Sequence, residues 1–137
     1  MKNIITLLLI VFTFTGCSND NDDKINNPVV GTWKLIKTRN LVAGVGDNHD
    51  VFTDYSDQNK IYKFDAKSNL TITTGSNVEN YKYEYKIDYL MGDASTGGTK
   101  SPIVVIDGVK YGYLFIDGQM ILEQSYVDGE DLYLKKQ

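Results

Sequence analysis

The sequence predicts an all-β protein whose single domain is an antiparallel up-and-down barrel of eight strands. From Val29 onward, short runs of residues alternate between apolar and polar with a period of two, and no run keeps a helical period. Asp-Gly pairs follow several runs, and this dipeptide favours tight hairpins because glycine readily takes a positive φ. Eight strands with short connections can close on themselves and leave no free sheet edge. An open two-sheet sandwich is the alternative.

The predicted strands follow one another to the C-terminus. In chain order they are 31–38, 60–66, 69–74, 80–90, 102–107, 111–117, 119–127 and 131–136. The clearest is 80–90, where Tyr81, Tyr83 and Tyr85 share one face while charged residues share the other, so we expect the phenols to point inward. The same alternation predicts which residues line the interior and would contact a ligand there: Trp33, Leu35, Tyr62, Phe64, Leu70, Ile72, Tyr81, Tyr83, Tyr85, Met120 and Leu122.

The predicted interior is either a ligand pocket or an ordinary packed core. An eight-stranded barrel is just wide enough for its own side chains or for one small ligand. Inward phenols favour a pocket, because each buried hydroxyl needs a hydrogen-bond partner and aromatic walls can hold an apolar body. Two function classes follow. One is a protein that binds a small apolar or amphipathic molecule, and the other is a protein-interaction or inhibitor module with a filled barrel.

The connections between strands alternate between the two ends of such a barrel. Four of them share one end, and these are 40–59, 75–80, 107–110 and 127–130. The first is a long loop without a helical pattern, and long loops in compact domains are usually functional or mobile, so we expect it at a ligand entrance. The other long connection, 91–101, lies at the opposite end, and its glycine and serine content predicts flexibility.

The first residues predict export. After Lys2, the run 4–14 is well short of the roughly 20 apolar residues that a membrane-spanning helix needs, so it is typical of a secretory signal. The sequence that follows, "FTGC" at 14–17, resembles the lipobox of bacterial lipoproteins, where a small residue precedes the modified cysteine. The resemblance implies a signal peptide over 1–16 and acylation of Cys17. Two or more acyl chains, at about 0.8 kcal/mol per buried methylene, would hold the protein on a membrane.

The segment 17–28 is predicted to be a flexible, acidic tether between the lipidated Cys17 and a barrel domain at 29–137. Its aspartates and asparagines leave almost no apolar surface to bury. An acidic run directly after the cysteine also resembles the export signal of outer-membrane lipoproteins. We therefore expect an outer-membrane lipoprotein, and whether it faces the periplasm or the cell surface stays open.

The start of the first predicted strand carries a second resemblance. Gly31-Thr32-Trp33, followed by eight up-and-down strands, resembles the lipocalin signature, and more narrowly that of small lipocalin-like lipoproteins. The resemblance covers Val29 to Lys136 and implies that Trp33 plugs the closed end of the barrel. Lipocalins stack an arginine on this tryptophan, so Lys135 or Lys136 would have to replace it here. Fatty-acid-binding proteins begin similarly, but they need two helices that 40–59 does not predict.

Charge and residue usage exclude several other classes. The chain has 14 basic and 18 acidic residues and no basic patch, so we expect no nucleic-acid partner. Cys17 is its only cysteine, His49 is its only histidine, and no catalytic motif is present, so we expect neither an enzyme nor a cofactor. Several residues around His49 could supply oxygen or nitrogen atoms to a metal ion, namely Asp47, Asn48, His49, Asp50 and Asp54. Their spacing matches no standard metal-binding loop, so no metal site is predicted there.

Overall fold

The computed structural model describes residues 26–43 and 48–137. The predicted signal peptide at 1–16, the predicted lipid site at Cys17 and the first part of the tether lie outside the described residues. No helix in the described part is long and apolar enough to cross a membrane.

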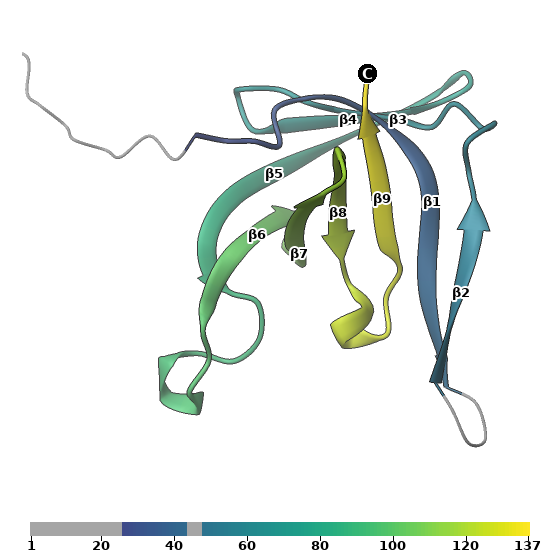
Figure 1. Ribbon diagram of the computed structural model, residues 1–137. Coiled ribbons are helices and arrows are strands. Elements are labelled where there is room, and N and C mark those ends of the chain that lie inside the picture. Colours follow the sequence, from purple (N-terminus) through teal and green to yellow (C-terminus); the bar gives the residue numbers. More distant parts are fainter. Residues whose placement is uncertain (1–25, 44–47) are drawn as a thin grey trace, which may run out of the picture.

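The described chain consists almost entirely of strands (Figure 1). Two single-turn 3-10 helices, η1 (Ala94–Thr96) and η2 (Ser125–Val127), interrupt them. The strands are β1 (Gly31–Ala43), β2 (Asn48–Asp54), β3 (Ile61–Phe64), β4 (Asn69–Thr74), β5 (Asn77–Tyr89), β6 (Lys100–Ile106), β7 (Val109–Ile116), β8 (Gln119–Glu123) and β9 (Asp131–Lys136).

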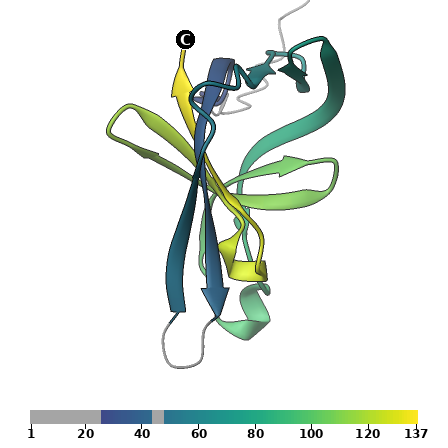
Figure 2. The same ribbon diagram turned by 90° about the vertical axis from the view of Figure 1, so that its right-hand side faces the viewer.

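Eight of these strands close into an antiparallel barrel, which confirms the predicted fold class and excludes the open sandwich. From β3 to β9 each strand pairs with its neighbour in sequence. The ring closes through β1, which pairs with β3 over Gly31–Lys34 on one side and with β9 over Trp33–Arg39 on the other. The order of the strands around the ring can be followed in Figures 1 and 2.

The prediction of a long loop over 40–59 is wrong for 40–43 and 48–54, which are strand. β1 continues to Ala43, and β2 pairs back with it from Lys37 onward as a long hairpin. Both β2 and β3 pair with β1 and run antiparallel to it, so β2 extends the line of β3 rather than adding a ninth member to the ring. Two hydrogen bonds hold the junction, from Tyr55 N to Ile36 O at 2.7 Å and from Leu35 N to Lys60 O at 2.9 Å.

Two other predicted boundaries also change. The predicted strand 119–127 is too long, because β8 ends at Glu123 and η2 follows it. Asp107-Gly108 and Asp117-Gly118 form the expected tight turns with positive φ, whereas Asp128 instead ends η2. The segment 91–101 contains η1, whose first turn is capped by the Asp93 carboxylate.

A register shift in β1 decides which of its later side chains face inward. The pairing with β9 skips one residue between Leu35 and Lys37, which is a β-bulge. Strict alternation would have turned Lys37 toward the axis. The bulge instead turns Thr38 inward, where it is 2% exposed and its hydroxyl has no hydrogen-bond partner.

A buried carboxylate ties the β8–β9 connection to the seam between β1 and β9. Asp131 is fully buried, and its Oδ1 accepts hydrogen bonds from the backbone N–H groups of Gln124 (2.7 Å) and Ser125 (2.8 Å). Its Oδ2 accepts from Arg39 Nε at 2.8 Å and Nη2 at 2.5 Å. The hydrogen bond to Asp131 is the main reason that the pKa of Arg39 is raised. Every acceptor direction of the carboxylate therefore has a partner.

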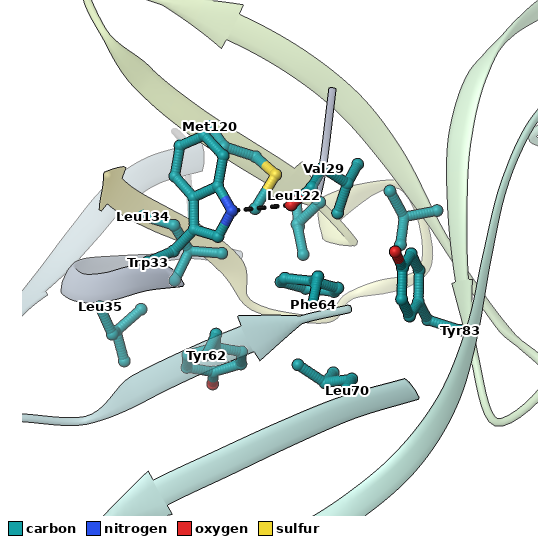
Figure 3. Packing of buried hydrophobic residues seen from close by; sticks show 11 residues of the cluster. Val29, Trp33, Leu35, Tyr62, Phe64, Leu70, Tyr83, Met120, Leu122 and Leu134 are labelled. Atoms are coloured by element: carbon teal, nitrogen blue, oxygen red, sulfur yellow. Dashed lines mark hydrogen bonds between the residues drawn. The ribbon is translucent and has the colours of Figure 1, made fainter. Parts of the chain in front are cut away.

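The segment before β1 closes one end of the barrel. Val29 is fully buried, and its carbonyl accepts a 2.8 Å hydrogen bond from Trp33 Nε1 (Figure 3). Asn27 Nδ2 donates to the Tyr83 hydroxyl at 3.2 Å, which ties the same segment to β5. The residues Asn27 and Pro28, which we expected in the tether, therefore lie against the barrel.

Candidate functional site

All eleven residues predicted to face inward belong to the barrel core. Eight of them are between 0 and 4% exposed, namely Trp33, Leu35, Tyr62, Phe64, Leu70, Tyr83, Met120 and Leu122. The other three, Ile72, Tyr81 and Tyr85, are partly buried against that cluster. The rings of Phe64 and Tyr83 meet edge to face at 4.9 Å (Figure 3). The middle of the barrel is therefore a packed core, and space for a ligand has to be sought at its ends.

A pocket of about 250 Å³ opens at one end of the barrel. It includes the β6–β7 turn, so of the four connections predicted to share a ligand entrance only 107–110 contributes to it. Its lining comes from six strands and that turn: Tyr62, Ile72, Tyr81, Ile106, Asp107, Val109, Tyr111 and Leu132. The predicted interior residues Tyr62, Ile72 and Tyr81 are brought together here.

The remaining predicted residues do not line this pocket, because they lie deeper or nearer the other end. The inward residues of β6, β7 and β9 that do line it were missing from the predicted set. Ile106, Tyr111 and Leu132 could have been found from the sequence by applying the same period of two to those three strands.

The Tyr62 hydroxyl is the most unusual polar group of this pocket. The residue is only 4% exposed, and in Figure 3 its hydroxyl points away from Trp33. Burial raises the pKa of Tyr62 well above its usual range, and the nearby phenols of Tyr111 and Tyr81 add to the shift. Among the described residues, no group forms a hydrogen bond with the Tyr62 hydroxyl. The Tyr81 hydroxyl, in contrast, donates a hydrogen bond to Glu79 Oε2 at 3.0 Å. A hydroxyl of this kind, on an otherwise buried residue and facing a pocket, is available to a ligand.

The charge around the pocket selects among ligands. None of its lining residues is a lysine or an arginine, and Asp107 stands at its rim. The Asp107 carboxylate accepts a 3.0 Å hydrogen bond from Lys82 N, which holds the rim in place. Burial raises the pKa of Tyr111, so this second phenol also stays neutral. The lining therefore offers no counter-ion to a carboxylate such as that of a fatty acid, and it suits a neutral molecule.

Trp33, which the lipocalin resemblance placed at the closed end, is 1% exposed and lies beside the last strand. Lys136 Nζ lies 5.6 Å from the centroid of the Trp33 ring, so Lys136 takes the place expected for a lipocalin arginine. Phe115 meets the same ring edge to face at 6.4 Å. A smaller pocket of about 170 Å³ lies beside them and is lined by Pro28, Trp33, Tyr113, Phe115 and Lys136.

The residues considered for metal binding are not arranged as a metal site in the described chain. Asp50 lies 3.8 Å from Arg39 as an exposed ion pair, and Asp54 accepts a hydrogen bond from Ser56 N at 2.8 Å. No group of three or more histidine, cysteine or acidic side chains could hold a metal within 26–43 and 48–137. His49 is exposed on β2, and Asp47 lies outside the described residues.

Comparison of the chain with known proteins found no matching family model, no matching curated protein and no matching solved structure. The class of the protein therefore rests on its strand pairing. It is a closed, eight-stranded, antiparallel up-and-down barrel, which is compatible with a calycin-like fold.

Proposed function

We propose that the chain is a lipid-anchored binding protein whose pocket at the barrel mouth takes a small neutral molecule, about one aromatic ring in size, that carries a hydrogen-bond acceptor. The observation that carries this proposal is the Tyr62 hydroxyl, which belongs to a residue only 4% exposed, lies at the pocket and has no partner among the described residues. A binding role, rather than catalysis, agrees with the lack of catalytic motifs in the sequence.

The volume of the pocket supports a ligand of this size. An apolar cavity of about 150 Å³ holds a benzene molecule, and pockets for drug-sized ligands measure about 300–1,000 Å³. The mouth pocket, at about 250 Å³, lies between these values. It has room for a single ring with a short substituent, and a long acyl chain would have to displace the packed core.

Acetophenone and ethylbenzene make a sharp pair of probes, because they differ in one carbonyl oxygen. We expect acetophenone to bind the wild-type chain more tightly than ethylbenzene, as measured by calorimetry or by ligand-observed NMR. A Tyr62→Phe substitution removes only the hydroxyl. A neutral hydrogen bond contributes about 0.5–1.5 kcal/mol, so Tyr62→Phe should weaken acetophenone binding by roughly 2- to 12-fold and leave ethylbenzene unchanged.

The matched control is Tyr85→Phe, which removes the same atom from another inward phenol that does not line the pocket. It should leave binding of both probes unchanged. Equal weakening of both probes by Tyr62→Phe, or no binding of either ring at millimolar concentration, would refute the proposed pocket.

The anchor is supported by the sequence before the described residues. The lipobox resemblance at Cys17 and the apolar run before it predict a lipidated N-terminus at the outer membrane. A Cys17→Ser chain should lose incorporation of a palmitate analogue and should leave the membrane fraction. The control Ser18→Ala should keep both. Membrane fractionation of Cys17→Ser identical to that of the wild type would reject the anchor.

A second candidate function is protein docking, and one observation favours it. Within the described chain β2 pairs only with β1, so its other edge offers free backbone groups beside the exposed side chains of Val51 and Phe52. An extended segment of a cell-envelope partner could add to this edge as a further strand. A partner that binds the wild-type chain in one-to-one ratio and is lost in Phe52→Asp, while acetophenone still binds, would favour docking.

A further inference from the structure

The last three residues of β7, directly before the β7–β8 turn, are exposed and apolar, and they cover both faces of the strand end because successive side chains alternate. Leu114, Phe115 and Ile116 are 39, 55 and 50% exposed. Exposed apolar residues are ordinary when they are scattered, but a contiguous group on the surface commonly marks a contact with a protein or a membrane. These three residues form what we call the hairpin tip.

The hairpin tip lies near Pro28, close to the start of the described chain. Phe115 contacts the Trp33 ring and shares the small pocket beside it with Pro28, the third described residue. In Figures 1 and 2 the turn between β7 and β8 lies in the same half of the molecule as the C-terminal end of β9. The mouth pocket includes the β6–β7 turn, which is at the opposite end of β7 from the hairpin tip.

The chain before Pro28 limits how far the hairpin tip can be from a lipid on Cys17. These two residues are eleven positions apart. At about 3.3–3.6 Å per residue, even a fully extended chain would span less than about 40 Å. A short tether of this kind creates an effective concentration on the order of millimolar, so a weak membrane contact by the domain becomes occupied.

We propose that the hairpin tip docks on the bilayer, with Leu114, Phe115 and Ile116 entering the boundary between headgroups and acyl chains. This inference rests on the lipid anchor of the proposed function. Lys135 and Lys136 are exposed at the end of β9 and Lys136 lies beside Phe115, so both cations are available to headgroup phosphates. Asp117, in the turn itself, carries a negative charge that headgroup phosphates repel, so its carboxylate stays in the water between headgroups. Docked in this way, the protein turns its mouth pocket away from the membrane.

Trp33 makes this orientation measurable, because it is the only tryptophan of the chain and contacts the hairpin tip. The full chain, lipidated on Cys17, is reconstituted into vesicles of phosphatidylcholine and phosphatidylglycerol with or without brominated acyl chains. Bromine quenches tryptophan only at short range. We expect brominated vesicles to lower Trp33 emission at least twofold relative to unbrominated ones.

The test variant is Leu114→Ser/Ile116→Ser, which removes two tip side chains and leaves Phe115, the neighbour of Trp33, in place. It should lose most of the quenching. The matched control is Val51→Ser/Val78→Ser, which changes two exposed valines outside the tip and should keep the quenching. Equal Trp33 emission of all three chains in unbrominated vesicles verifies that the core around Trp33 is unchanged.

Three results would overturn the docking, and the first two differ from failure of the proposed function. If the wild-type protein cosediments with vesicles but its Trp33 is not quenched, the protein has an anchor and its hairpin tip is not docked. If quenching persists in the tip variant, other residues make the contact with the membrane. Wild-type protein that does not cosediment overturns the anchor and the docking together. Acetophenone binding, measured separately, reports on the mouth pocket alone.

Discussion

The buried carboxylate of Asp131 provides the most demanding test of the fold. Asp131→Asn keeps the shape of the side chain but replaces one acceptor oxygen by an NH₂ group, which is a donor. The remaining oxygen can face either the backbone N–H groups of Gln124 and Ser125 or the Arg39 guanidinium. One set of donors therefore loses its acceptor and meets another donor.

The expected loss of stability follows from these contacts. A hydrogen bond to a charged group contributes about 1.5–3 kcal/mol, and breaking a buried ion pair costs about 3–5 kcal/mol. The Arg39 side chain is 27% exposed, so water recovers part of this loss. We therefore expect Asp131→Asn to lower the free energy of unfolding by about 3 kcal/mol.

Urea unfolding followed by Trp33 fluorescence measures this loss. With a slope of about 2 kcal/mol per molar urea, the midpoint should fall by about 1.5 M. Asp50→Asn is the matched control, because Asp50 faces the same arginine at 3.8 Å from an exposed position and should cost less than about 0.5 kcal/mol. A loss below about 1 kcal/mol for Asp131→Asn, or equal losses in both variants, would refute this account of the seam.

Three further variants test other parts of the structure. Thr38→Val removes a buried hydroxyl that has no hydrogen-bond partner, so it should raise the free energy of unfolding by about 1 kcal/mol. Urea titration measures this change. A decrease would mean that the hydroxyl binds a ligand or a water molecule. Burial, and then Asp131, raises the pKa of Glu123, so its folded form binds more protons and stability should fall as pH rises from about 4.5 through that raised value. Glu123→Gln should remove this fall in pH-dependent melting and be slightly more stable at pH 7. His49→Ala should leave acetophenone affinity unchanged, and a tenfold loss would restore the metal hypothesis.

The lipocalin resemblance predicted two features of the closed end that the structure contains. Trp33 lies at that end under the segment that contains Val29, and Lys136 rather than Lys135 lies on its ring. The choice between the two lysines follows from register, because Trp33 pairs directly with Lys136 and successive residues of a strand point to opposite faces.

The sequence by itself determined the all-β class, the hairpins and the inward rows of side chains. These features depend on local rules, namely a period of two along each strand and positive φ at Asp107-Gly108 and Asp117-Gly118. The row of Tyr81, Tyr83 and Tyr85 follows these rules, and all three phenols pack in or against the core.

Only the tertiary structure decided where β2 forms, which residue of β1 is bulged and how much of the interior is empty. Phe52 and Val51 lie on opposite faces of β2 beside polar residues, so no local pattern marks a strand there, and pairing with β1 supplies the hydrogen bonds that stabilise it. The burial of Asp131 depends on Arg39, which is 92 residues away in the sequence. The volume of the pocket beside Tyr62 likewise depends on side chains from six strands, and a period along one strand carries no information about the space that the other strands leave.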